Sequence, residues 1–127
     1  MKVLLDSHAF LWAISSQTKV SPRVRQIFTG PHDLLLSVVS MWEILIKTQI
    51  GKLRLPSAAG EYLLKQMARN HIEALPVNLD HVLRVESLPA HHRDPFDRLL
   101  IAQSLEEALP IVTADPVFSL YPVTTIW

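Results

Sequence analysis

Short apolar runs alternate along this chain with segments whose apolar residues recur at helical spacing. Residues 3–5 and 34–36 are continuously apolar, which is typical of strands buried on both faces of a parallel sheet. Three further short apolar runs are also interpreted as strands. The pattern predicts five strands, over residues 2–6, 34–37, 71–75, 111–113 and 123–126.

Helix-start signals lie between these runs. A serine before Pro22, an asparagine at position 78 and an aspartate before Pro95 are preferred N-cap arrangements. Ser40 and Glu43 have the spacing of a capping box. The predicted helix starts are Ser21, Ser40, Ser57, Asn78 and Asp94. Gly51 is predicted to end the third helix, and the longest helix is expected over residues 95–108.

The alternation of strands and helices predicts an α/β fold. We expect one domain over residues 1–127, with a central, mostly parallel sheet of about four to five strands and helices on both faces. We find no internal repeat, low-complexity tract or linker in the sequence.

Composition narrows the class of protein. Apolar residues make up 49% of the 127 residues and charged residues 19%, as in globular proteins. The absence of cysteine excludes disulfides, thiolate zinc sites and cysteine nucleophiles. Asp6 and His8 interrupt the first apolar stretch, so no signal peptide is expected, and no run is long enough to span a membrane. We therefore expect a cytoplasmic protein.

The formal net charge of zero hides an uneven distribution. Residues 1–60 carry seven Lys/Arg and three Asp/Glu, whereas residues 61–127 carry five and nine. Lys47, Lys52 and Arg54 lie in a stretch without acids and could contact a phosphate backbone. A solvated helix end explains the same three cations equally well.

Four acidic residues stand next to chain that is expected to be buried. Asp6 ends the first apolar run, Glu43 lies within residues 40–46, Asp97 begins the apolar part of the longest helix, and Asp115 follows residues 111–114. Ionised carboxylates are costly there and would repel one another if they converged. Sites in parallel sheets form at the carboxyl ends of the strands, where all four are expected. A divalent cation would compensate them, so the pattern predicts a metal site of the kind that cuts phosphodiesters.

Each acid also has a structural interpretation. Asp6 could cap the following helix, and Glu43 could complete a capping box. Asp97 could complement its helix dipole, with Asp94 as the more obvious cap. Asp115 could be a turn residue before a proline.

Other candidate side chains are weaker. His91 and His92 are adjacent and lack the spacing of a ligand pair on a helix, although their loop lies beside the predicted cleft. Trp12, Trp42 and Phe96 are interpreted as core residues. The sequence has no glycine-rich phosphate loop, nucleophile elbow or zinc motif. A phosphoaspartyl hydrolase would need an acid two residues after Asp6, where this chain has histidine.

Four segments of the chain resemble the signature blocks of PIN-domain ribonucleases, and more narrowly those of VapC-type toxins from toxin–antitoxin pairs. The segments are residues 4–12 (LLDSHAFLW), 37–44 (SVVSMWEI), 92–102 (HRDPFDRLLIA) and 112–115 (VTAD). The resemblance covers the chain in order and spacing. Ser7 stands where threonine is commoner in that family.

The resemblance implies a three-layer PIN fold, an RNA substrate and a homodimer. It also implies a magnesium or manganese site formed by Asp6, Glu43, Asp97 and Asp115. The partner would be an antitoxin from the adjacent gene, with a peptide in the cleft and often an arginine against the acids.

Further side chains are expected to assist this site. Ser7, Thr113 and Asp94 would support the ligands. Lys47 and Arg98 are candidate phosphate contacts beside Lys52 and Arg54, with a salt bridge as the alternative for Arg98.

Two other functions compete with this prediction. One is an inert module of the same fold that binds RNA or a protein, which four intact acids argue against. The other is a metal-dependent DNase, for which the short chain lacks the extra helices that thread DNA.

Overall fold

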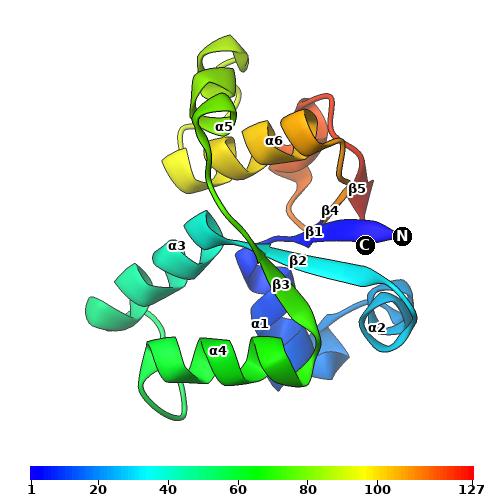
Figure 1. Cartoon of the computed structure of the whole chain (residues 1–127), viewed down its shortest axis with the longest axis vertical. Helices are drawn as coiled ribbons and strands as arrows, with labels where there is room; N and C mark the ends of the chain where they lie inside the picture. Colours follow the sequence, from blue (N-terminus) through cyan, green and yellow to red (C-terminus); the bar gives the residue numbers. More distant parts are fainter.

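A five-stranded, wholly parallel sheet lies at the centre of the computed structural model (Figure 1). The structure describes residues 1–127, with the side chain of Gln17 excepted. The strands, in the spatial order β3-β2-β1-β4-β5, are β3 (Ile72–Leu75), β2 (Asp33–Ser37), β1 (Lys2–Leu5), β4 (Ile111–Val112) and β5 (Thr125–Ile126). All five predicted strands are present and their ends agree within two residues, so the predicted fold class is confirmed.

Helices cover both faces of the sheet. They are α1 (Ser7–Ser15), α2 (Pro22–Thr29), α3 (Val38–Gln49), α4 (Ala59–Arg69), α5 (Leu79–Arg84) and α6 (Pro95–Glu107), with 3-10 turns η1 (Gln17–Lys19), η2 (Val85–Ser87) and η3 (Pro116–Leu120). In Figure 1, α1, α2 and α4 lie on one side of the sheet and α5 and α6 on the other. None of the described helices combines the length and apolar character needed to cross a membrane.

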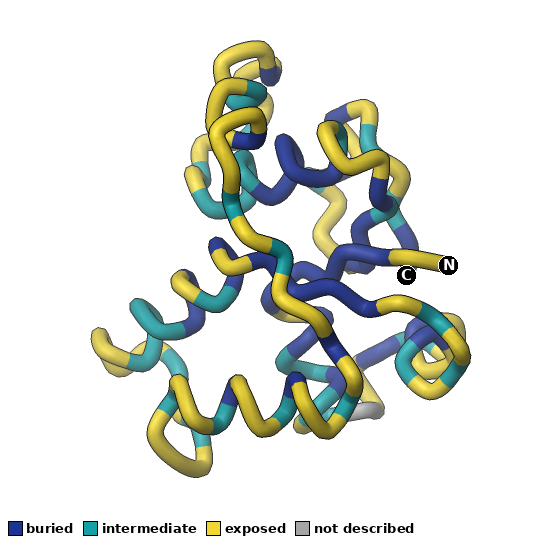
Figure 2. Tube along the Cα trace, in the orientation of Figure 1, coloured by how far each residue is buried: buried dark blue, intermediate teal, exposed yellow. Residues whose placement is uncertain are grey.

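The core consists of two layers because successive strand residues point to opposite faces. Val3 and Leu5 belong to one apolar cluster with Phe10 of α1, whereas Leu4 belongs to the other with Ile101 of α6. All five of these side chains are fully buried. The continuous dark blue along the central strands in Figure 2 reflects this burial on both faces.

The predicted helix starts are partly right. Ser21, Asn78 and Asp94 cap α2, α5 and α6 through their side chains, as predicted. The capping box from Ser40 is wrong, because α3 begins at Val38 with Ser37 as its N-cap. Ser40 and Glu43 therefore lie inside α3, on its buried side.

The cap predicted at Ser57 is also wrong. Helix α4 starts at Ala59 after Ala58, which makes no side-chain capping bond. Gly51 follows the C-cap of α3 at φ 78°, a left-handed conformation that favours glycine, so the predicted end of that helix is confirmed.

The strand order places a switch point between β1 and β4. The chain proceeds outward from β1 to β2 and β3, then returns to the opposite side of β1 as β4. Chain segments leaving β1 and β4 diverge there and open a crevice at the carboxyl edge. Asp6 follows β1 directly, and Thr113 follows β4. This topology brings two of the sequence-predicted site residues to the same edge.

Candidate metal centre

Asp6 is buried at the end of β1, with 5% of its surface exposed. Its Oδ1 accepts a hydrogen bond from the Ala9 amide at 2.6 Å, so it caps α1, and its Oδ2 accepts from the Thr113 hydroxyl. Burial raises the pKa of Asp6 above its ordinary value, although both hydrogen bonds lower it. The structural interpretation of Asp6 as a helix cap is thus correct. The buried carboxylate of Asp6 is also costly to ionise in the crevice.

Asp115 reaches the same crevice from β4. Its amide donates to the Thr113 Oγ1 at 3.1 Å, and its carboxylate caps η3 by accepting from the Val117 amide at 3.0 Å. Asp115 is exposed, yet its charge adds to the factors that raise the pKa of Asp6. The two carboxylates line one small cavity of about 190 Å³.

Glu43 lies on the buried side of α3, with 7% of its surface exposed. The Ser7 hydroxyl donates to its Oε1 at 2.9 Å, and the Lys47 ammonium lies 3.4 Å from its Oε2. Because Ser7 follows Asp6 in the chain, this bond ties the first turn of α1 to Glu43. Among the described residues, Ser7 supports an acid as the family resemblance implied.

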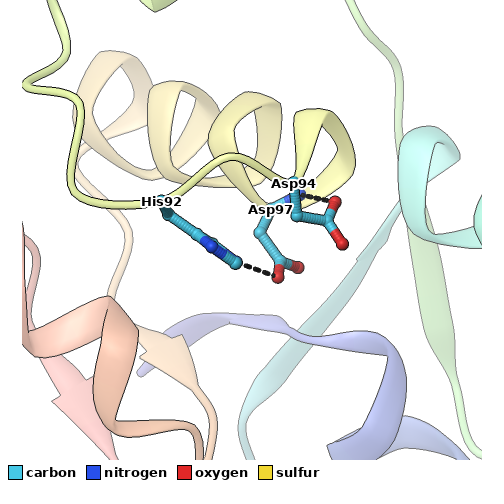
Figure 3. Close-up of side chains that lie close together, drawn as sticks. All are labelled: His92, Asp94 and Asp97. Atoms are coloured by element: carbon cyan, nitrogen blue, oxygen red, sulfur yellow. Dashed lines mark hydrogen bonds and ion pairs between the residues drawn. The ribbon is translucent and has the colours of Figure 1, made fainter.

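Asp97 lies in the first turn of α6, and Figure 3 shows His92 pointing toward it. The His92 Nε2 is 2.7 Å from the Asp97 Oδ2. Burial raises the pKa of Asp97 to about 6; the His92 hydrogen bond opposes this, whereas the charges of Asp94 and Glu43 add to it. Asp94 itself caps α6 by accepting from the amides of Phe96 and Asp97.

These contacts link the four acids of this neighbourhood in two pairs. Asp115 acts electrostatically on Asp6, and Glu43 acts on Asp97. Ser7, which follows Asp6 in the chain, bonds Glu43 through its hydroxyl. Like charges gathered around buried oxygen atoms fit a hard divalent cation, which accepts carboxylate ligands and would offset the cost of burial.

A histidine also belongs to this neighbourhood. One atom each of His92, Asp94 and Asp97 lie within 4.8 Å of one another. His92 is a weak candidate from the sequence because it lacks the spacing of a ligand pair on a helix, yet it reaches Asp97 from a loop. Its five-residue separation from Asp97, across the Asp94-Pro95 helix start, was the available signal.

The predicted cations are placed differently from one another. Lys47 pairs with Glu43 inside the acid neighbourhood. Lys52 and Arg54 line a neighbouring groove, which Lys47 also lines. Arg98 turns away from the acids and donates to the carbonyls of Val85, Leu88, Pro89 and His92 and to the Tyr121 hydroxyl.

Arg98 therefore holds the loop that carries His92. It takes part in none of the salt bridges found between described side chains, so the salt bridge offered as its alternative is wrong, and its contact with a phosphate stays a prediction. The assignment of Trp42 to the core is wrong, because 58% of its surface is exposed while its ring packs edge-on against Phe96.

Comparison with known proteins decides the family. The family model of the PIN domain matches residues 3–123. The chain belongs to the PIN-domain family. This confirms the family predicted from the four sequence segments.

The relatives agree with this assignment. Ribonuclease VapC22 of Mycobacterium tuberculosis is 25% identical over 114 residues, which cover 89% of this chain and 86% of that protein. The fold is similar to a chain of VapBC2 from Rickettsia felis, with a TM-score of 0.76, 14% identity and coverage of 100% and 99%. A chain of FitAcB from Neisseria gonorrhoeae matches with a TM-score of 0.66, 18% identity and coverage of 100% and 97%. The resemblance to VapC-type toxins stated from the sequence is thus confirmed.

Proposed function

We propose that this PIN-domain protein is a metal-dependent endoribonuclease and the toxin of a toxin–antitoxin pair. The observations that support the proposal are that Asp6 and Asp115 line one cavity, that Glu43 and Asp94 lie near enough to Asp97 to raise its pKa, and that burial raises the pKa of Asp6 and Asp97. The likeness to Ribonuclease VapC22 supports RNA as the substrate. The whole chain, residues 1–127, acts as one domain in this proposal.

Magnesium or manganese is the proposed cofactor, with Asp6, Asp97 and Asp115 as its ligands. When bound, such an ion lowers the pKa of water and offsets negative charge on a phosphate. The protein's own contribution is to fix the ligands. Thr113 orients Asp6 through its hydroxyl, and His92 orients Asp97 at 2.7 Å.

Glu43 has a different part in the proposed reaction. It is fixed on two sides, by the Ser7 hydroxyl at 2.9 Å and the Lys47 ammonium at 3.4 Å. A carboxylate held in this way can orient an attacking water or help to hold a second ion. Asp94 supports the site indirectly, because its two capping bonds fix the turn that carries Asp97.

The proposed partners are a second copy of the chain and an antitoxin encoded by the adjacent gene. The similar structures named VapBC and FitAcB support a protein partner. An acidic crevice favours an arginine, whose planar guanidinium can bind two carboxylate oxygens. The inhibitor's cation is expected beside Asp6, Glu43, Asp97 or Asp115. Light scattering tests the dimer.

Cleavage assays test the function directly. The purified protein should cut single-stranded RNA with magnesium or manganese present, spare DNA, and lose activity in EDTA. Co-expression with the neighbouring gene should suppress both toxicity and cleavage. Cleavage of DNA instead would favour the DNase alternative, and binding of RNA without any cleavage would favour the inert module.

A further inference from the structure

A groove of about 690 Å³ lies beside the acid crevice, between α1, the segment after α3, and α4. Its floor is apolar and includes Leu11 and Ile44, whereas its rim carries four cations and no carboxylate. The cations are Lys19, Lys47, Lys52 and Arg54.

The chain after α3 explains how this rim forms. Residues 53–55 belong to no helix or strand; Leu53 and Leu55 pack against the core, whereas Lys52 and Arg54, which alternate with them, are exposed. Of the four rim cations, only Lys47 takes part in a salt bridge among the described side chains, with Glu43. Three positive charges therefore face the groove without a carboxylate partner, which favours an anionic occupant.

The groove is continuous with the acid crevice. His8 and Trp12 line both the groove and the cavity that holds Asp6 and Asp115. The two rings lie 5.7 Å apart, and the exposed Lys19 ammonium lies 5.8 Å from the centre of the Trp12 ring. A bound chain that extends from the acids into this groove would contact the aromatic side chains first and the unpaired cations next.

We infer that this groove binds the single-stranded RNA on one side of the cleaved phosphate. In this arrangement Trp12 stacks on a base and Lys19, Lys52 and Arg54 contact successive phosphates. The inference rests on the proposed function, since it assumes that the cleaved phosphate lies at the acids. Aromatic side chains flanked by cations are the usual means of binding single strands without reading their sequence. A polyanion also matches a row of cations better than a peptide with scattered charges does.

The cations are tested by the salt dependence of RNA binding. A short fluorescein-labelled single-stranded RNA is titrated in EDTA, where cleavage cannot occur, over a series of salt concentrations. Neutralising three phosphate contacts should lower the slope of log Kd against log salt by about 2, at about 0.7 per phosphate. The variant is Lys19→Gln/Lys52→Gln/Arg54→Gln. Its matched control is Arg23→Gln/Lys65→Gln/Arg69→Gln, which removes three exposed cations outside the groove and should leave the slope nearly unchanged.

The aromatic contact is tested with an RNA that contains 2-aminopurine, whose fluorescence is quenched by stacking. Trp12→Leu should abolish part of the quenching and weaken binding about tenfold or more, whereas Trp12→Phe should retain both. If Trp12→Leu does not fold, as its melting curve would show, Trp12→Phe and the charge variant still decide the matter.

The outcomes separate the groove from the proposed function. If wild type cuts RNA but the charge variant binds RNA with an unchanged slope, the groove assignment is overturned and the nuclease remains. If wild type cuts nothing yet the slope falls as expected, the groove stands and the nuclease fails. If the charge variant keeps its RNA binding but no longer binds the antitoxin, the groove belongs to that protein and the inference is wrong.

Discussion

Ser37, Gln103 and His81 form a fully buried polar cluster, whereas in the acid cluster Asp6 and Glu43 are buried, Asp97 is half-buried and Asp115 is exposed. The two clusters also differ in charge. The Ser37 hydroxyl donates to the Gln103 Oε1, and the Gln103 Nε2 donates to the Pro76 carbonyl at 3.2 Å. The His81 Nδ1 accepts from the Asn78 amide at 3.1 Å, which leaves its Nε2 to face Glu107 at 3.0 Å. This cluster joins β2, α5 and α6 and is neutral apart from its contact with Glu107 at the surface.

The acid cluster is equally well bonded but accumulates one sign of charge. In both clusters, no described buried side-chain nitrogen or oxygen lacks a hydrogen-bond partner. Yet burial and neighbouring carboxylates raise the pKa of Asp6 and Asp97. The comparison indicates that satisfied hydrogen bonds do not distinguish a structural polar cluster from a functional one. The uncompensated charge distinguishes them, because it destabilises the protein unless a ligand binds.

The largest effect is expected when an acid loses its charge. Asp6→Asn and Asp97→Asn should each reduce RNA cleavage more than about 100-fold, beyond the range typical for groups that only support a ligand. The melting temperature in EDTA should hold or rise, since repulsion falls. Asp33→Asn, an exposed acid at the other end of β2, is the control and should change neither quantity. Melting temperatures that fall sharply in both variants without metal would make these acids structural.

A smaller effect is expected from the histidine that contacts Asp97. His92→Ala should weaken magnesium binding about 10- to 100-fold, because Asp97 loses the partner that orients it. Isothermal titration calorimetry at neutral pH measures the affinity, and His91→Ala is the neighbouring control. Equal affinities for both variants would remove His92 from the site.

The neutral cluster should respond in stability alone. Gln103→Ala leaves the Ser37 hydroxyl and the Pro76 carbonyl without their partner, which costs about 1–3 kcal/mol of unfolding free energy. Urea unfolding in EDTA measures this loss. Magnesium affinity of the folded variant should match wild type, and a loss of affinity as large as that of His92→Ala would erase the distinction between the two clusters.

The smallest effect is the pH dependence of the metal-free protein. The pKa of Asp97 is about 6 in the folded state against an ordinary value of 3.8, so the native protein holds this proton more tightly than the unfolded chain does. Its contribution to stability is therefore present at low pH and is lost as pH rises through about 6. Asp6 contributes in the same direction.

Denaturant unfolding in EDTA between about pH 4 and 7.5 measures this dependence, and Asp97→Asn should flatten it. Magnesium should reverse it, because an ion that binds only the folded, ionised site stabilises the protein at neutral pH and less so below about pH 6. A metal-free stability that rises with pH and is unaffected by Asp97→Asn would contradict the assigned shift.

Much of the fold could be predicted because it follows from local pattern. Short apolar runs indicated all five strands, and their parallel direction follows from the helices between them. The failure at Ser40 is an error in choosing between two serines near a helix start, whereas α4 begins after Ala58 without a side-chain cap. Ser37 caps α3 because β2 ends there, and that end depends on its pairing with β1 and β3.

The sequence by itself determined which acids are expected at the carboxyl edge, since Asp6 and Asp115 follow strands and Asp97 lies in the first turn of α6, although Glu43 lies further along α3. Only the tertiary structure decided how they are held. Thr113 bonds Asp6 across 107 positions, Ser7 bonds Glu43 across 36, and Arg98 turns away to hold the loop that carries His92. The physical reason is range. Apolar periodicity is set within one element, whereas these side-chain hydrogen bonds require the donor and acceptor atoms of two elements to lie within about 3 Å of each other.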